Sequence, residues 1–449
     1  MWETLWRRCY DLGRRALESP TTTAVLLGMQ LALRNPGLRR LIGVLVLRLL
    51  SMAFMLWLLV FNSLGCDLLL PLTIYNPPLL LLAALGVRLL RWRQPQSAET
   101  LMQTARRVRS AVRSFFLRLW VDALVSWAET VGGLDLIVTG DDIVPSEACV
   151  VLCNHQSWVD SLIIFCLAST AGRSGDFRFL AKRSLLYLPI IGTAAKFTGG
   201  SLFIRRKYEQ DAGRMQRTYR QLLTRRQPFW FTIFAEGTRL NSRSKLAEAK
   251  RYYREVTRKQ TAAVDGSDNA NTTTTAHPLP LVEPRYCLVP RVKGFQRAVA
   301  GLRDRIGAVY DLTIFYENLA DETPNRAGEW VPRPTVADMY LWATRWVRAE
   351  RYRVHVHVRR TPVAALPDTE DGLARWMFAN YADKERLLQR AHAQCAFRGE
   401  RAASRQPPTW RALLLALLQL TAVNVSMAWL LRTLWVWARR TLHPSVALS

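Results

Sequence analysis

The sequence predicts an α/β domain combined with membrane segments, and two patterns indicate this. Between about residues 100 and 400, short apolar runs alternate with longer helix-like stretches, which is typical of a sheet flanked by helices. Outside this region, residues 49–66 and 413–431 are uncharged and approach the length that spans a bilayer. A chain of 449 residues has room for one large domain with such additions.

The N-terminal part is predicted to hold a basic amphipathic stretch, residues 1–40, followed by membrane segments in residues 41–95. Acidic residues within the basic stretch argue against a mitochondrial targeting sequence, because such sequences avoid acids. The second apolar run, residues 68–87, contains Asn76-Pro77-Pro78, and proline breaks a helix in its middle. That run is therefore expected either to span with a kink or to re-enter as a hairpin.

A C-terminal transmembrane helix is predicted over residues 411–437. Arginines flank its apolar run on both sides, and Trp435 and Trp437 near its end are typical of interface anchors. A buried hydrophobic helix of a soluble domain is the alternative interpretation. Because basic residues flank the apolar runs on both sides, the orientation in the membrane stays open.

The chain is strongly basic, with 62 Lys and Arg against 35 Asp and Glu and a formal net charge of +27. This charge suits nucleic acid, an anionic membrane surface or a polyanionic substrate. Sixteen tryptophans favour the membrane, and no nucleic-acid-binding motif or zinc-ligand spacing is visible. We therefore expect a lipid bilayer as a partner, and neither nucleic acid nor a bound metal. The seven scattered cysteines are typical of buried free thiols.

Several apolar segments in the central region are predicted to be strands, namely CVVLC (149–153), FWFTIF (229–234), YCLVP (286–290), AVYDLTIFYE (308–317) and YRVHVHV (352–358). The segment SWVDSLIIFCL, residues 157–167, is expected to form a helix. Residues 258–284 are small, polar and turn-rich, so a flexible surface insertion is expected there. This insertion contains the sequon Asn271-Thr272-Thr273, for which an unmodified loop is the favoured interpretation.

The motif NHQSWVD, residues 154–160, follows the first predicted strand and leads into the predicted helix. The carboxyl ends of strands are where α/β sheets usually carry their chemistry. There, a carboxylate at Asp160 can fix the tautomer of His155 and stabilise its protonated form, which is the arrangement of a general base. A structural polar turn is the more common outcome for this spacing alone.

Three further motifs carry glycines and basic residues next to predicted strands. In FAEGTR, a strand runs into a turn with backbone amides, a hydroxyl and an arginine, a combination suited to hold a phosphate. GGSLFIRR, residues 199–206, allows close backbone approach and ends in two arginines. LVPRVKG, residues 288–294, ends a strand at a proline before two basic residues. Each motif alone is also explained by a capped turn or a solvated basic strand end.

In chain order, the four motifs together resemble the glycerophospholipid acyltransferase family, whose members carry NHxxxxD, a Gly-rich segment ending in a basic residue, FPEGTR and a late V-Pro-x block. The resemblance covers residues 123–384 and includes the helix-like segment 370–388. Its outer parts are similar to the branch with 1-acyl-sn-glycerol-3-phosphate and lysocardiolipin acyltransferases. Ala235 stands where the family usually has proline, and the insertion lengthens the distance to LVPRVKG. The resemblance implies a mixed sheet flanked by helices.

The resemblance also implies roles for individual residues. His155 would take the proton of a lysophospholipid hydroxyl, which then attacks acyl-CoA directly, while Asp160 orients His155. Substrate phosphate binding would fall to Glu236, Gly237, Thr238, Arg239, Lys182, Arg205 and Arg206. Pro290 would shape the acyl site. No cofactor or metal is expected, since acyl-CoA is a co-substrate; His355 and His357 share a strand face but need a further ligand to bind a metal.

Lysophosphatidic acid is the favoured acceptor, which would make the chain a 1-acyl-sn-glycerol-3-phosphate O-acyltransferase. Lysophosphatidylinositol and monolysocardiolipin are the alternative acceptors. Two other interpretations stay open at this point: a basic membrane tether without catalysis, and a hydrolase that uses Cys153 with His155. The favoured location is the endoplasmic reticulum membrane, with a mitochondrial membrane as the alternative.

Overall fold

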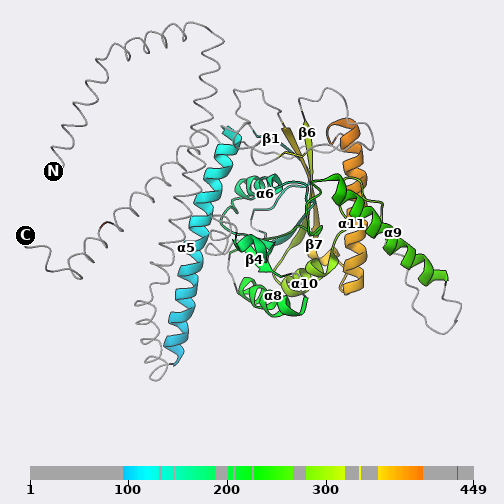
Figure 1. Ribbon diagram of the computed structural model, residues 1–449. Coiled ribbons are helices and arrows are strands. Elements are labelled where there is room, and N and C mark those ends of the chain that lie inside the picture. The colour runs from blue at the N-terminus through cyan, green and yellow to red at the C-terminus, as the bar shows by residue number, and fades with distance from the viewer. Residues whose placement is uncertain are drawn as a thin grey trace, which may run out of the picture. The chain divides into compact units, whose positions relative to one another are not determined.

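The structure is a computed structural model (Figure 1). It describes residues 95–130, 134–145, 147–187, 201–205, 208–224, 227–265, 280–318, 333–334, 352–397 and Arg432. The predicted membrane segments before Pro95, and the predicted C-terminal helix apart from Arg432, lie outside these residues. Within the described part of the chain, no helix combines the length and the apolar character needed to cross a membrane.

The described strands form one mixed sheet of seven strands, in the order β1-β7-β6-β2-β5-β3-β4. Their bounds are β1 Asp135–Gly140, β2 Cys149–Cys153, β3 Phe177–Lys182, β4 Ser201–Ile204, β5 Trp230–Ile233, β6 Ala308–Asn318 and β7 Tyr352–Pro362. Strands β6, β2, β5, β3 and β4 are parallel, whereas β7 is antiparallel to β6 and parallel to β1. The five parallel strands therefore end at the same edge of the sheet, and the predicted α/β class is confirmed.

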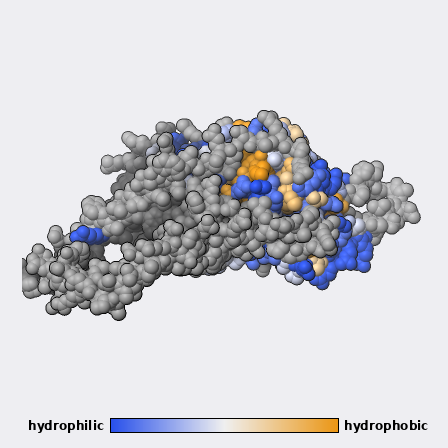
Figure 2. All heavy atoms as spheres, turned by 90° about the horizontal axis from the view of Figure 1, so that it is seen from above, coloured by the Kyte–Doolittle hydropathy of each residue, from blue (hydrophilic) through white to orange (hydrophobic). Residues whose placement is uncertain are grey.

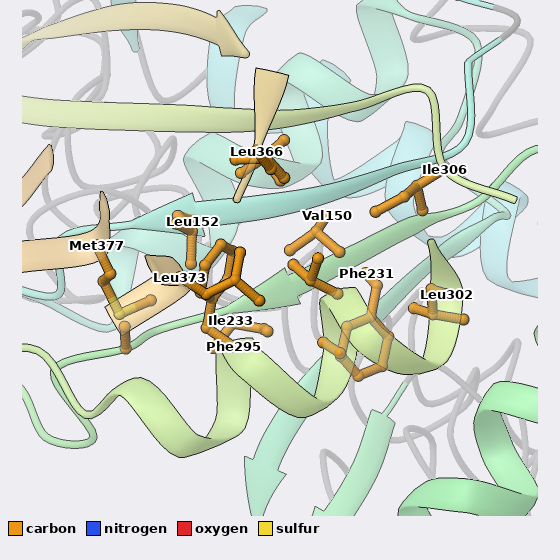
Figure 3. Close-up of a cluster of buried hydrophobic side chains, with 14 of the residues drawn as sticks. Val150, Leu152, Phe231, Ile233, Phe295, Leu302, Ile306, Leu366, Leu373 and Met377 are labelled. Carbon is orange, nitrogen blue, oxygen red and sulfur yellow. The ribbon is translucent and has the colours of Figure 1, made fainter. Parts of the chain in front are cut away.

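The described helices lie around this sheet, except that α9 extends away from it (Figure 1). They are α5 Pro95–Thr130, α6 Val159–Thr170, α8 Tyr208–Leu223, α9 Arg243–Asp265, α10 Val292–Leu302 and α11 Glu370–Gln394, with short 3-10 helices η1 Arg183–Tyr187 and η3 Val363–Ala365. Figure 3 shows the core between β2, β5 and α10, formed by Val150, Leu152, Phe231, Ile233, Phe295 and Leu302. Helix α6 packs through Phe165 against Phe177 and Phe179 of β3. Apolar burial on strands and helices thus fixes the layers.

The prediction of a strand over residues 286–290 is wrong, for a physical reason. Residues 286–290 form no strand, because the Glu385 carboxylate of α11 accepts the backbone N–H groups of Arg285, Tyr286 and Cys287 at 2.9–3.1 Å. A carboxylate that receives three amides replaces the partner strand that those amides would otherwise need. The predicted insertion is helical at its beginning, since α9 continues to Asp265; residues 266–279 lie outside the described residues.

The described surface mixes apolar and hydrophilic side chains (Figure 2). Trp158 and Tyr187 are among the large apolar side chains that are exposed, at 39% and 72%. Trp158 belongs to NHQSWVD, and Tyr187 ends η1 directly after β3. Apolar side chains are therefore exposed close to the edge at which the parallel strands end.

Candidate functional site

Asn154 explains how the chain leaves the sheet just before His155. Strand β2 ends at Cys153, and the Asn154 side chain then donates to the Ile314 carbonyl at 2.9 Å and accepts from the Ile314 N–H at 2.8 Å. A side-chain amide offers one donor and one acceptor face, as a peptide group does. Asn154 therefore continues the pairing with β6, while its own backbone is free to turn and carry His155 out of the sheet.

His155 and Asp160 form the predicted pair, with 2.8 Å between Nδ1 and Oδ2. The same carboxylate oxygen accepts the backbone N–H groups of Gln156 at 2.6 Å and Ser157 at 2.9 Å. Asp160 is fully buried in the first turn of α6, where the helix dipole favours a negative charge. Because a carboxylate accepts, the Nδ1 atom carries the proton and Nε2 is left as the basic atom. The His155 side chain is 17% exposed, so the ring can be reached from solvent.

The FAEGTR turn holds the His155 loop on two sides. The Oε1 atom of Glu236 accepts the His155 N–H at 3.0 Å, and the Leu240 N–H donates to the His155 carbonyl at 2.7 Å. The imidazole also stacks on Phe234, with 4.0 Å between the ring centroids. Two predicted motifs that lie about 80 residues apart are therefore one structural unit.

Glu236 lies behind the loop and not on the solvent side. Its side chain is buried, with 2% of the residue exposed, and this burial raises its pKa well above the usual range. A buried carboxyl that receives a backbone amide supports the chain that it contacts. The structure thus brings Glu236 to the site, but against the backbone of His155.

Contacts of Gly237 and Arg291 join the motifs FAEGTR and LVPRVKG. Gly237 has φ +70°, and a Cβ atom there would lie 3.0 Å from the Arg291 side chain. The Arg291 N–H donates to the Ala235 carbonyl at 2.7 Å, and buried Pro290 directly precedes it. Glycine is therefore required by both the left-handed backbone and the close approach.

Arg239 is half-buried beside the histidine loop. Its guanidinium lies 4.2 Å from the centroid of the Trp158 ring, a cation–π contact with the motif that carries the base. Burial lowers the pKa of Arg239, and the Asp160 carboxylate opposes that shift. Thr238 is also half-buried and precedes Arg239 in the turn. A cation and a base therefore lie side by side.

Lys182 and Arg205 lie at the same edge of the sheet, on neighbouring strands. Lys182 ends β3 and pairs in register with Ile204 of β4, after which Arg205 follows. Both side chains are exposed, and the Arg205 backbone N–H donates to Asp211 at 2.9 Å. Strand β3 is separated from β2 by β5. Arg206, Gly199 and Gly200 lie outside the described residues.

Three residues contact this site without having been predicted. The Tyr316 hydroxyl of β6 donates to Oδ1 of Asp160 at 2.6 Å. Ser157 Oγ donates to the Pro334 carbonyl, and the adjacent Arg333 is half-buried; desolvation lowers its pKa to about 10 while Asp160 opposes the shift. No local sequence pattern could have found these residues, because they lie far from the motif in the chain; Tyr316, for example, is 156 residues from Asp160.

The cysteine interpretation is not supported by the position of Cys153. The residue is fully buried in β2, and burial raises the pKa of its thiol well above the ordinary value. A protonated, inaccessible thiol is a poor nucleophile. His355 and His357 are engaged elsewhere: Nε2 of His355 lies 2.8 Å from Glu317, and Nδ1 of His357 lies 3.3 Å from Thr139 Oγ1. No cluster of three or more potential metal ligands occurs among the described residues.

A His–Asp pair beside a cationic turn, at the carboxyl edge of an α/β sheet, is an arrangement that can remove a proton next to a bound anion. Residues 135–281 match the family described as Acyltransferase, and residues 345–418 match the one described as Acyltransferase C-terminus. Two acyltransferase family models therefore match the chain, and the first of them covers the residues that hold the His155 motif and the FAEGTR turn.

The curated relatives bear acyltransferase names. The chain is 28% identical over 289 residues to 1-acyl-sn-glycerol-3-phosphate acyltransferase 2 of Brassica napus, covering 63% of this chain and 62% of that protein. It is 29% identical over 278 residues to the gamma form of Homo sapiens, covering 60% and 62%, and 29% identical over 239 residues to the delta form of Bos taurus, covering 53% and 52%. The chain thus spans between about half and three fifths of the length of these curated relatives.

Among solved structures, the chain is similar to the 1-acyl-sn-glycerophosphate acyltransferase PlsC from Thermotoga maritima. The sequence identity is 13%, the match covers 79% of this chain and 97% of that chain, and the TM-score is 0.33.

Proposed function

We propose that this chain transfers a fatty acyl group from acyl-CoA to the sn-2 hydroxyl of lysophosphatidic acid, giving phosphatidic acid. One observation carries the proposal: the hydrogen bond from Leu240 N–H to the His155 carbonyl joins the base to the turn that presents Arg239. A hydroxyl that must lose a proton and a phosphate that needs a cation belong to the same small substrate. The names of the curated relatives support this choice of acceptor.

In this mechanism, Nε2 of His155 accepts the proton of the acceptor hydroxyl. The hydroxyl oxygen forms an ester bond to the thioester carbonyl carbon, and the carbon–sulfur bond breaks. The departing thiolate of CoA takes a proton back from the imidazolium, so the enzyme returns to its starting state without an acyl-enzyme. Asp160 stabilises the imidazolium in the meantime. Because a thiolate is a good leaving group, positioning and one base supply most of what is needed.

The phosphate of the acceptor is assigned to Gly237, Thr238 and Arg239, with Trp158 holding the guanidinium in place. Lys182 and Arg205 add positive charge at this edge of the sheet. We assign Arg206, together with them, to binding of the substrate phosphate. Glu236 is assigned to the backbone of His155, since its carboxyl is buried there. Pro290 keeps its proposed role at the acyl site.

The membrane is part of this proposal. The acceptor and the acyl chain both partition into a bilayer, and a chain with a net charge of +27 is attracted to anionic lipid. We therefore place the enzyme at a membrane surface, with the endoplasmic reticulum as the favoured compartment.

The test follows the release of the CoA thiol from oleoyl-CoA by the full-length, detergent-solubilised protein. Lysophosphatidic acid, lysophosphatidylinositol and monolysocardiolipin are offered separately. We expect release that needs lysophosphatidic acid and falls by about 10²–10⁴-fold in His155→Ala. His357→Ala is the matched control, because it removes a histidine from β7 and leaves the site intact.

Other outcomes would replace the proposal. A requirement for another acceptor would change the substrate but keep the chemistry. Release without any acceptor would indicate a thioesterase. Equal activity in His155→Ala and wild type would refute the assignment of His155 as the base. No thiol release with any acceptor would favour a membrane tether that keeps the fold.

A further inference from the structure

We propose that Tyr316 is a positioning residue for the reaction: its hydroxyl holds the outer oxygen of Asp160 and thereby sets how strongly His155 takes up a proton. This inference rests on the proposed function, in which His155 is the general base. Tyr316 lies on β6, outside the four sequence motifs. It belongs to the part of the site that only the tertiary structure brings together.

The two oxygens of Asp160 have different partners. Oδ2 accepts from Nδ1 of His155 and from the backbone N–H groups of Gln156 and Ser157, at 2.6–2.9 Å. Oδ1 accepts from the Tyr316 hydroxyl at 2.6 Å, which is a short, charge-assisted hydrogen bond. Asp160 and Tyr316 are both fully buried. With both oxygens held, the carboxylate cannot rotate away from the imidazole.

The register of β6 places Tyr316 over Asp160. The last backbone pair between β2 and β6 joins Cys153 to Leu312, and Asn154 extends this pairing to Ile314 through its side chain. Residues two apart on a strand share a face, so Tyr316 follows Ile314 on the same face, beyond the end of β2. There it meets the first turn of α6, which carries Asp160.

Tyr316 acts as a donor and not as a charge. Burial, together with the neighbouring Asp160 carboxylate, raises the pKa of the phenol well above its ordinary value, so the phenol keeps its proton. A donor on Oδ1 draws negative charge away from Oδ2, the oxygen that faces His155. Without this donor, more negative charge faces the imidazole, and the protonated form of His155 is favoured.

Other ionisable groups also face Asp160, and they stay unchanged when only the phenol oxygen is removed. They are Cys153 of β2, Glu236 and Arg239 of the FAEGTR turn, and Arg333. The variant Tyr316→Phe keeps the aromatic ring and its packing. Its effect on the proton affinity of His155 therefore reports on the single hydrogen bond.

Tyr310 supplies a matched control on the same strand. It is also buried, and its hydroxyl donates to Glu147 at 2.7 Å, away from His155. Tyr310→Phe removes an equivalent hydrogen bond to a carboxylate from the same face of β6. A loss that is merely structural should therefore affect Tyr310→Phe and Tyr316→Phe in a similar way.

The experiment compares the wild type, Tyr316→Phe and Tyr310→Phe as full-length protein in detergent, with thiol release from oleoyl-CoA measured against pH. For Tyr316→Phe we expect kcat to fall about ten-fold, with KM for lysophosphatidic acid almost unchanged, because an Asp160 carboxylate that has lost its charge-assisted hydrogen bond on Oδ1 can rotate and no longer holds the imidazole in place. We also expect the acid limb of the pH profile to move up by about half a pH unit. Tyr310→Phe should leave both the rate and the acid limb near the wild type. An unmoved acid limb, or equal effects of the two variants, would overturn the inference.

A second readout does not depend on activity. Diethyl pyrocarbonate modifies neutral imidazole, so its rate of reaction at His155, followed by peptide mass spectrometry against pH, reports the protonation of this residue. The midpoint should be higher in Tyr316→Phe than in Tyr310→Phe and the wild type. If the wild type showed no acceptor-dependent thiol release, the proposed function would fail. A shifted midpoint of the pH dependence of modification would still support the Tyr316–Asp160–His155 coupling in that case. Coincident midpoints would refute that coupling in an active enzyme or an inactive one.

Discussion

The buried residue His392 of α11 leads us to predict that the folded state loses stability in acid. The residue is 1% exposed; its ring stacks on Tyr286 at 4.2 Å and meets the edge of Phe315 at 4.8 Å between centroids. Within the described structure, neither ring nitrogen has a hydrogen-bond partner. Burial lowers the pKa of His392 from 6.5 to about 3, and the positive charge of Arg333 adds to this effect. The folded protein therefore keeps this imidazole neutral.

The sign and size of the effect follow from proton linkage. Below about pH 6.5 the unfolded chain binds a proton at this histidine and the folded chain does not, so stability falls as the pH falls towards 3. Each unit of pH below 6.5 removes about 1.4 kcal/mol. At pH 5 the loss from His392 alone is therefore about 2 kcal/mol, a large part of the stability of a typical domain.

The assay is urea unfolding of the wild type and His392→Phe at about pH 7.5 and pH 5. Phenylalanine suits this position because both neighbouring rings are aromatic, and it does not titrate. Other groups also titrate in this range, but they contribute to both proteins and cancel in the comparison. We expect the wild type to lose about 2 kcal/mol more than the variant between the two pH values. Equal losses would refute the reasoning, because they would mean that His392 is protonated as easily in the folded state as in the unfolded one.

Two further predictions concern a buried ion pair and a strained turn. Nζ of Lys384 lies 2.7 Å from Asp311, and both are buried, so Lys384→Met should cost about 3 kcal/mol in urea unfolding, because Asp311 then keeps only the longer contact with Arg359 at 3.5 Å. Adding Asp311→Leu should recover most of this cost, and no recovery would mean that the poorly paired carboxylate is not its cause. Gly237→Ala should cost about 1–2 kcal/mol from its positive φ and, by displacing Arg291, should also raise KM for the acceptor. Gly172→Ala, with φ +67° and open space around the Cβ position, should show the backbone cost alone; an equal KM for the two variants would contradict a role of the turn in binding.

Much of the fold could be predicted from local patterns. The segment CVVLC is fully buried in β2, as its unbroken apolar run indicated, and residues 308–317 and 352–358 form strands β6 and β7. Helix α6 follows the histidine loop as expected. Such patterns are informative because burial on a sheet or helix imposes a period on the residues themselves. The segment 286–290 fits the same pattern and fails, since its amides bind a carboxylate 98 or more residues away.

By itself, the sequence determined the chemical groups that the site holds: a histidine in the loop after a strand, a carboxylate five residues later at the start of a helix, and an arginine after a glycine turn. These depend on neighbours in the chain, so the order of residues specifies them. Only the tertiary structure decided how the parts meet: that Glu236 supports the backbone of His155, and that Tyr316 fixes Asp160 from another strand. Such contacts depend on strand order and register. These are set by the packing of the whole sheet, so no local stretch of sequence predicts them.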